Sequence, residues 1–301
     1  MKEIYFAGGC YWGTEHYMKQ IHGVTDTAVG FANGEGENPT YEEVYTDRTG
    51  FAETVRVRYD EAKLPLKELV EAFFVSIDPL SLNRQGMDCG TRYRTGVYYT
   101  NEADGAVVKE CLDALQNEFE QALAVELLPL QNFYEAEERH QDYLGKNIGG
   151  YCHLNSKLFL YPRLLTELKA LLGDESDALA RMANAAAMIA ERMRFFWTGF
   201  YFVKGDELVL GPFCGPVACM RIKYGRGVCG ACWERKEAIV VPDVEKFKGH
   251  IACSTLSKSE IVLPLFAEGQ VVAVLDIDSD RLASFDRADL YWLSKIAGII
   301  L

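Results

Sequence analysis

The chain has 301 residues, 49% of them apolar and 25% charged, and a formal net charge of −13 at pH 7. This length suits two domains of about 150 residues each. The negative charge disfavours nucleic acid as a partner, because phosphate binding needs clustered Lys and Arg. No apolar run is long enough to predict a transmembrane helix, which disfavours a membrane partner. The N-terminus has no signal-peptide pattern, so we expect the protein in the reducing cytoplasm.

Nine cysteines are the most informative feature of the composition. They occupy positions 10, 89, 111, 152, 214, 219, 229, 232 and 253. An odd number in a cytoplasmic chain disfavours a purely structural disulfide framework. Cys229 and Cys232 form the sole Cys-x-x-Cys pair, and no histidine pair completes the spacing of a closed zinc site. We therefore expect no metal and no cofactor, and redox chemistry is the best use of the thiols.

In the first half, hydrophobic periodicity predicts a mixture of strands and helices. Strands are expected at residues 4–7, 52–59 and 95–99, and helices at residues 14–20, 66–76 and 102–123. Residues 145–156 are rich in Gly, Asn and Ser, which is typical of a loop leaving a domain.

The second half begins with a helical pattern from Tyr161 to Arg194, broken near residues 173–174, in which Pro162 suits a first turn. Strands are expected at residues 198–203, 207–211, 238–241, 260–266 and 271–276. A hairpin turn is expected at Glu268-Gly269, and a closing helix over residues 284–300 with Ser284 as its N-cap. We see no internal repeat, so the chain is expected to contain two different folds, at residues 1–156 and 157–301.

Cys10 is the first candidate nucleophile. A thiolate is the reactive form of cysteine, so a catalytic thiol needs a lowered pKa. Cys10 follows a short strand and Gly8-Gly9 and precedes a predicted helix, where the helix dipole favours negative charge. Small neighbours, including Gly13, leave space around the thiol. Burial as a small apolar residue is the alternative role for a cytoplasmic cysteine.

Residues 1–154 resemble the peptide methionine sulfoxide reductase A family. The resemblance rests on GGCYWGTE, NPTYEEV, TGFAETVRV, DPLSLNRQGMDCGTRYRTGVYY and HQDYL…GGYC. It implies a two-layer α+β domain in which Cys10 attacks the sulfoxide sulfur and Glu53 protonates the departing oxygen. A carboxyl that donates a proton near neutral pH must be kept neutral by apolar surroundings.

The same resemblance assigns the remaining roles in this half. Tyr41 and Tyr93 would donate hydrogen bonds to the sulfoxide oxygen, and Asp88 would orient the backbone amide of the substrate. Tyr11 and Trp12 would enclose the S-methyl group. Tyr11 replaces the usual Phe, and Met87 and Cys89 flank Asp88 where other residues are usual.

The attack would leave a sulfenic acid on Cys10, which is the first oxidised state of a cysteine thiol. By the resemblance, Cys152 in the GGYC segment would condense with this sulfenic acid to form a disulfide. Thioredoxin or a similar dithiol would then reduce the disulfide by thiol exchange. Cys89 and Cys111 are expected simply to pack.

Residues 161–301 resemble the GAF-fold free methionine-(R)-sulfoxide reductases. The resemblance rests on FWTGFYF, GPFCGPVACMRI, GRGVCG, GHIAC, SEIVLPL and VLDIDS. It implies an α/β GAF domain with an antiparallel sheet and flanking helices, with Cys219, Cys229 and Cys253 as redox cysteines. We expect Cys253 as nucleophile and Cys219 as its main resolving thiol, and the choice between Cys253 and Cys229 stays open.

The family's carboxylates match Glu260, Asp276 and Asp278. Anionic groups suit the ammonium of a free amino acid, and like charges in one pocket raise the pKa of at least one acid into the range of a proton donor. Without the resemblance, the two aspartates are typical turn residues after a strand. Trp197 and Tyr201 would line the methyl end of the pocket.

The two halves together predict a bifunctional, thiol-dependent reductase. A sulfoxide sulfur is stereogenic, so separate sites are expected for the two epimers. The first half would act on free and peptide-bound methionine-(S)-sulfoxide, and the second on free methionine-(R)-sulfoxide.

Two other readings remain open. In the first, the second half would be a ligand-sensing GAF module that regulates the first half. In the second, Cys229-Gly-Ala-Cys232 would be a thioredoxin-like disulfide exchanger. The sequence around Cys229 and Cys232 does not resemble the strand and helix in which a disulfide-exchange motif normally lies.

Overall fold

The computed structural model describes residues 1–251 and 254–301 and divides into two compact units, Met1–Phe159 and Leu160–Leu301. Each unit has its own six-stranded sheet. Among the described residues, no helix has both the length and the apolar character needed to cross a membrane. The expected nucleophile Cys253 lies outside the described residues.

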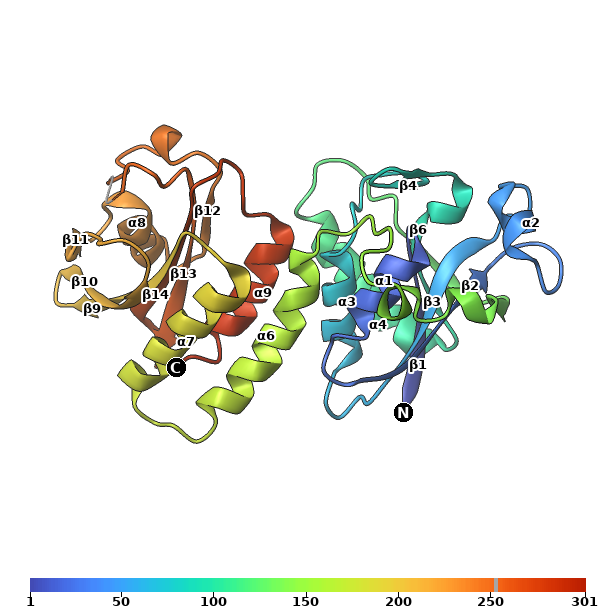
Figure 1. Cartoon of the computed structure of the whole chain (residues 1–301), viewed down its shortest axis with the longest axis horizontal. Coiled ribbons are helices and arrows are strands. Elements are labelled where there is room, and N and C mark those ends of the chain that lie inside the picture. The colour runs from blue at the N-terminus through green and yellow to red at the C-terminus, as the bar shows by residue number, and fades with distance from the viewer. Residues whose placement is uncertain (252–253) are drawn as a thin grey trace. The chain divides into compact units, whose positions relative to one another are not determined.

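The first unit is built on a sheet with the strand order β7-β6-β1-β3-β2-β8, in which only the described pair β6 and β7 is parallel (Figure 1). Its strands are β1 (Lys2–Gly8), β2 (Val24–Ala32), β3 (Ala52–Tyr59), β6 (Thr95–Tyr99), β7 (Glu126–Pro129) and β8 (Phe133–Glu135), with β4 (Arg84–Gln85) and β5 (Asp88–Cys89) as a separate hairpin. Its helices are α1 (Tyr11–Met18), α2 (Tyr41–Tyr45), α3 (Leu66–Phe74), α4 (Glu102–Gln116) and α5 (Tyr143–Lys146).

Strand β1 and helix α1 are joined by a turn that only glycine accommodates at its centre. Gly9 has φ +81°, and a Cβ there would lie 2.6 Å from the Cβ of Gln85. The turn lets α1 start directly at the end of a central strand and pack against β2 and β3. Cys10 is therefore the N-cap of α1, at a helix N-terminus as predicted, although the helix begins at Tyr11 and not at residue 14.

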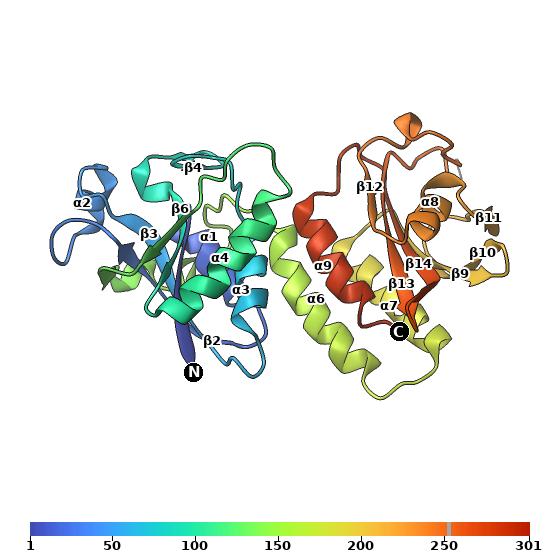
Figure 2. The ribbon, with the colours of Figure 1, turned by 180° about the vertical axis from the view of Figure 1, so that it is seen from behind.

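The second unit contains an antiparallel sheet with the order β11-β10-β9-β14-β13-β12 and helices on both sides of it, as Figures 1 and 2 show. The strands are β9 (Trp197–Lys204), β10 (Glu207–Cys214), β11 (Arg221–Lys223), β12 (Ile239–Val241), β13 (Ser259–Ala267) and β14 (Gln270–Ser279). The helices are α6 (Lys157–Leu172), α7 (Ala178–Met193), α8 (Gly227–Arg235) and α9 (Arg287–Ala297). The expected fold class, a two-layer α+β domain followed by a GAF-type α/β domain, is confirmed.

Several predicted boundaries are wrong for local reasons. Helix α4 ends at Gln116 because the Gln116 side-chain amide binds the backbone of the following loop at Phe119, Gln121 and Leu123. Pro162 lies inside α6 and not in its first turn, since that helix already begins at Lys157.

The closing helix also starts later than predicted, at Arg287. Its N-cap is Asp286, which forms a capping box with Asp289, and Ser284 instead bonds Ser279. An aspartate with an acidic residue three positions later is a stronger cap than an isolated serine.

Arg181 on α7 ties together the ends of the second unit. Its guanidinium donates to the carbonyl oxygens of Ile299 and Ile300 at 2.7 Å each, and to those of Leu172 and Glu175 at 3.2 and 2.6 Å. These carbonyls lie in the last residue of α6 or in the residues that follow α6 and α9, so they have no partner within those helices.

We expect Arg181→Ala to lower the free energy of unfolding of the second unit by about 2–4 kcal/mol, because buried carbonyls lose charged donors. Urea denaturation followed by circular dichroism measures this. Arg192→Ala is the matched control on the same helix, since Arg192 is 47% exposed and pairs with Glu167 at the surface. An equal loss of the free energy of unfolding in the two variants would contradict a stabilising role of the Arg181 hydrogen bonds.

Candidate active sites

The first site is built where the end of β1 meets the start of α1. Cys10 is 5% exposed, and the backbone N–H of Trp12 lies close enough to favour its thiolate. Glu53 on β3 reaches the same helix end, where its carboxylate accepts a hydrogen bond from the Tyr11 backbone N–H at 3.0 Å. The free N–H groups of α1 therefore hold both candidate reacting groups.

Glu53 is 2% exposed, and burial raises the pKa of its carboxyl to about 8. The Tyr11 N–H and the charge of Arg92 oppose this shift, and the charge of Asp88 adds to it. At neutral pH most of the population carries the proton on Glu53. The group is then a proton donor beside Cys10, which is the state that an acid catalyst needs.

The expected low pKa of Cys10 is wrong for this structure. Burial raises the pKa of the Cys10 thiol well above its usual value, and the negative charge of Glu53 raises it further. The helix N-terminus does favour the thiolate, but one backbone N–H does not offset removal of the thiol from water. When Glu53 is protonated, its charge no longer raises the pKa of Cys10, and only the effect of burial remains of these two.

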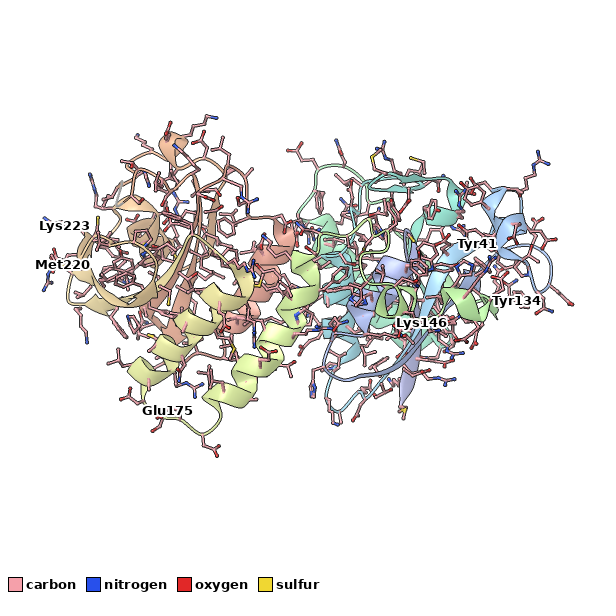
Figure 3. All side chains as sticks on the ribbon, in the orientation of Figure 1. Tyr41, Tyr134, Lys146, Glu175, Met220 and Lys223 are labelled. Carbon is pink, nitrogen blue, oxygen red and sulfur yellow. The ribbon has the colours of Figure 1, made fainter. Side chains whose placement is uncertain are left out.

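Aromatic rings surround the thiol end of the site. Trp12 stacks on Tyr143 with centroids 3.8 Å apart and on His140 at 5.7 Å. Tyr41 on α2, labelled in Figure 3, also stacks on His140, with centroids 4.8 Å apart. Tyr11 is 1% exposed, and within the described chain its hydroxyl has no hydrogen-bond partner. These rings form the apolar lining expected for an S-methyl group.

Tyr93 lies in the short 3-10 helix Thr91–Tyr93, against the Arg92 guanidinium at 4.4 Å from its ring centroid. Arg92 is held by an ion pair with Asp47 at 2.8 Å. Burial, and then the charge of Glu53, raise the pKa of both Tyr93 and Tyr41, that of Tyr41 to about 12. Both phenols therefore keep their protons and can donate hydrogen bonds to an oxygen near Glu53.

Cys152 also lies at this site. A Cβ built on Gly13 would be 2.9 Å from Cys152 Sγ, so this thiol packs against the first turn of α1. Asp88 contacts the same segment through the Tyr151 hydroxyl at 2.8 Å. The structure thus brings together all eight residues predicted for this half: Cys10, Tyr11, Trp12, Tyr41, Glu53, Asp88, Tyr93 and Cys152.

The second site lies on the face of its sheet that α8 covers. Glu260 on β13 pairs with Asp278 on β14, and Asp276 lies two residues before Asp278. Because side chains alternate along a strand, the three carboxylates share one face. Together with Cys229, Trp197 and Tyr201 they line a single cavity.

Cys229 Sγ lies 3.9 Å from Glu260 Oε1. One donor atom each from Cys229, Glu260 and Asp276 lie within 4.8 Å of one another, all in buried residues. A thiolate with two carboxylates has the composition of an open zinc site, and the same two carboxylates also suit a substrate ammonium. The sequence did not predict a possible metal geometry here.

Burial raises the pKa of Asp276 and of Glu260 well above the usual range. The charge of Asp278 adds to the shift of Asp276, and the charges of Asp276 and Asp278 add to the shift of Glu260. Asp278, which accepts a hydrogen bond from Ser257, has its pKa raised by burial to about 6. Burial, and next the charge of Asp276, raise the pKa of the Cys229 thiol. At neutral pH this cluster therefore holds protons on buried acids.

The aromatic end of the cavity is fixed by two hydrogen bonds to the loop after β10. Trp197 Nε1 donates to the carbonyl of Pro216, and the Tyr201 hydroxyl donates to the carbonyl of Cys219, each at 3.0 Å. Cys219 is itself disulfide-bonded. The loop that contains Cys219 is thus attached to the rings that line the pocket.

Other cysteines differ from expectation. Cys111 is buried, but Cys89 is exposed, so the expectation that both simply pack is wrong for Cys89. Cys229 and Cys232 lie within α8, a helix that the Gly-rich sequence did not predict. Burial raises the pKa of both thiols, and the surrounding described strands are antiparallel, unlike the exposed, acidic motif of a disulfide exchanger.

Sequence reasoning missed three residues of the first site. His140 and Tyr143 complete the aromatic lining, and both lie within the HQDYL string that supported the family resemblance. Histidines were weighed only as zinc ligands. His153, directly after Cys152, is also buried in the site, with Nε2 3.1 Å from the Gly8 carbonyl.

Glu53→Gln should remove a pH-dependent loss of stability. Because the folded-state pKa of Glu53 is raised from 4.5 to about 8, its favourable contribution is complete below pH 4.5 and is lost as the pH rises through 8. The variant should therefore gain free energy of unfolding over the wild type between pH 5 and 9, by at most about 5 kcal/mol. Denaturation at several pH values, with exposed Glu35→Gln as control, measures the gain; parallel curves would contradict the buried acid.

Asp276→Asn should stabilise the second unit above pH 6. The change removes one of the like charges whose repulsion raises the pKa of Glu260. We expect the free energy of unfolding at pH 8 to rise by about 1–3 kcal/mol. Asp174→Asn, in the exposed loop between α6 and α7, is the control, and a loss of stability in Asp276→Asn would show that the carboxylate is structurally required.

Comparisons with known proteins agree with this division. Residues 2–168 match the family model described as peptide methionine sulfoxide reductase, and residues 173–300 match a GAF domain. The peptide methionine sulfoxide reductase MsrA of Clostridium acetobutylicum is 52% identical over 158 residues, covering 52% of this chain and 98% of the relative. The corresponding protein of Lachnoclostridium phytofermentans is 50% identical, covering 52% and 95%.

For the second half, the chain is similar to a solved structure of free methionine-R-sulfoxide reductase from Neisseria meningitidis in complex with its substrate. The identity is 48%, with 48% of this chain and 89% of that chain covered and a TM-score of 0.48. The family model for the first half alone covers more than half of the chain. The chain therefore belongs to the peptide methionine sulfoxide reductase family, and its second half is a GAF domain.

Proposed function

We propose that the chain is a bifunctional methionine sulfoxide reductase whose halves, residues 1–156 and 157–301, act on opposite epimers. The observation that carries the first activity is the buried, protonated Glu53 beside Cys10. Attack of the Cys10 thiol on a sulfoxide sulfur transfers the oxygen to Cys10 and releases the sulfide. That oxygen must be protonated as it leaves the substrate, and Glu53 is the adjacent group that holds a proton at neutral pH.

Tyr41 and Tyr93 support this role because both phenols remain protonated near Glu53 and can hydrogen-bond the developing oxygen charge. The rings of Tyr11 and Trp12 would receive the S-methyl group, and Asp88 would accept the substrate's backbone amide. The products are methionine and a sulfenic acid on Cys10. Cys152 would condense with it, and the packing of this thiol against Gly13, three residues after Cys10, supports that role.

The second half would reduce free methionine-(R)-sulfoxide. Glu260, Asp276 and Asp278 offer anionic acceptors for the ammonium and protonated acids for the sulfoxide oxygen, while Trp197 and Tyr201 form the apolar wall. A pocket of buried carboxylates selects a free amino acid, because a peptide-bound residue has no ammonium to neutralise them.

Cys253 is our proposed nucleophile in this half, with Cys219 resolving it and Cys229 able to participate. The choice of Cys253 over Cys229 rests on the family resemblance. Burial, and next the charge of Asp276, raise the pKa of the Cys229 thiol, so its thiolate is disfavoured until a cation enters the cluster. A thioredoxin-type dithiol would reduce the disulfides of both halves, since each cycle ends in one.

The test is the loss of each epimer of free and N-acetylated methionine sulfoxide, with dithiothreitol as reductant, in the full-length protein. Cys10→Ser should abolish only reduction of the S-epimer, in both free and N-acetylated substrates. Cys253→Ser should abolish only reduction of the free R-epimer. Cys89→Ser and Cys214→Ser are matched controls in the two halves and should retain both activities.

Retention of R-epimer reduction by Cys253→Ser would reject Cys253 as nucleophile. Cys229→Ser then decides between the alternatives: loss of the activity identifies Cys229, and retention favours a sensory GAF module. Efficient reduction of the N-acetylated R-epimer would contradict a pocket selective for free amino acids.

A further inference from the structure

Three buried side chains of the second site, Cys229, Glu260 and Asp276, bring metal-binding atoms together. One donor atom from each lies within 4.8 Å of the other two, and Cys229 Sγ is 3.9 Å from Glu260 Oε1. Bonds of about 2.0–2.3 Å in a tetrahedron place the ligand atoms of Zn²⁺ roughly 3.5 Å apart. Small side-chain shifts would therefore let this cluster enclose a zinc ion.

The fold holds the three side chains of the cluster in place. Glu260 lies on β13 and Asp276 on β14, which are paired along their lengths. Cys229 lies in the first turn of α8, and this helix packs on both strands. A Cβ built on Gly230 would be 2.5 Å from the Lys223 carbonyl oxygen, so the turn lies directly against the end of β11. Ligands that are already in position bind a metal with little cost of ordering.

One oxygen of the cluster is an unsatisfied acceptor. Asp276 Oδ1 is buried and accepts no hydrogen bond from any residue that the structure describes. Asp276 is 6% exposed and lines the cavity of the second site. A buried polar atom without a partner costs about 1–3 kcal/mol, and more when it is charged. A cation bound in the cavity would satisfy this oxygen.

The cavity also lacks a cationic side chain to neutralise its acids. Among the described residues that line it there is no Lys or Arg. His250 lines it, but burial lowers the pKa of this histidine, so its ring is neutral at pH 7. Asp278 accepts a hydrogen bond from Ser257, whereas Glu260 and Asp276 interact with each other and with the thiol. Two crowded carboxylates without a counter-ion favour a bound cation.

We propose that the second site binds Zn²⁺ through Cys229 Sγ and one oxygen each of Glu260 and Asp276, and that this zinc excludes free methionine-(R)-sulfoxide. The sulfur selects zinc over calcium and magnesium, because those harder cations prefer oxygen ligands. The cavity has a volume of about 40 Å³, which leaves room for a water molecule as the fourth ligand. The exclusion of substrate, unlike the binding of zinc, rests on the proposed function of this half.

Zinc binding exchanges protons for a metal ion and changes no oxidation state. The Cys229 thiol gives its proton to water as the zinc–sulfur bond forms, and any protonated carboxyl ligand does the same. The metal then occupies the carboxylates that would receive the substrate ammonium. In the part of the chain that the structure describes, no second group of His, Cys, Asp and Glu has this geometry. We therefore expect zinc to inhibit the second half and to spare the first.

Zinc binding is tested on the full-length protein, reduced and then freed of reductant by gel filtration under argon. The wild type should retain one zinc per chain. Competition with a chromophoric chelator should show that Cys229→Ser and Asp276→Asn each raise the Kd for zinc about 100-fold or more, since loss of a group that merely supports a ligand already costs 10–100-fold. One equivalent of Cd²⁺ should give the ultraviolet band of a cadmium–thiolate bond in the wild type.

Cys232→Ser is the matched control. Cys232 is a buried thiol of the same helix, but its Sγ lies 3.7 Å from the Val262 carbonyl and outside the cluster. The Kd for zinc should be unchanged in this variant. Cys10→Ser should also leave it unchanged, which excludes the thiol of the first site as the ligand.

Inhibition is measured in a single turnover of the reduced protein, because thiol reductants would themselves bind zinc. One equivalent of zinc should abolish methionine formation from free methionine-(R)-sulfoxide. The same zinc should leave the reduction of N-acetylated methionine-(S)-sulfoxide unchanged.

A Kd that neither Cys229→Ser nor Asp276→Asn raises would overturn the proposed site, and so would zinc that is lost from the wild type on gel filtration. The cadmium band is read in the wild type and Asn keeps the shape of Asp, so misfolding of Cys229→Ser would not leave the question open. Bound zinc without inhibition would reject the exclusion of substrate. Failure of the zinc-free protein to reduce the R-epimer would instead reject the proposed function of the second half, while the binding experiment still tests the metal site.

Discussion

The hydrogen bond from the Tyr11 backbone N–H to the Glu53 carboxyl joins a central strand to the start of a helix, and the first site depends on it. It holds a buried acid next to a buried thiol at the same helix end. Burial dominates the electrostatics of both groups, so each keeps its proton at rest. A site with two neutral partners avoids the cost of buried charge until a polar substrate arrives.

The second site reaches a similar state by a different arrangement. Its acids are crowded together on neighbouring strands, and repulsion adds to burial in keeping them protonated. Here a cation can compensate the cluster, whereas in the first site burial of Glu53, with a smaller effect of the Asp88 charge, keeps the acid protonated next to neutral phenols. The contrast agrees with substrates that differ in the charge near the sulfoxide, a free ammonium in one case and a peptide amide in the other.

Residues that follow a short local rule could be predicted from the sequence. Strands over residues 52–59 and 95–99 have the predicted boundaries because both are short runs rich in Val, Thr and Tyr, which favour strands locally. Helix α8 could not be predicted, since GVCGACWER has low intrinsic helix propensity and is stabilised by packing on β13 and β14. The pKa of Cys10 was misjudged for the same reason: the helix end is visible in the sequence, but the depth of burial depends on distant strands.

Gly13 shows how a short string near the N-terminus depends on a segment at the far end of its domain. A side chain at this position would collide with Cys152 Sγ and with the ring of His153. The packing of the late segment thus depends on the absence of a side chain in the early one. The motif around Cys10 therefore shapes more than its own turn, because Gly13 also provides the space that the Cys152 thiol occupies.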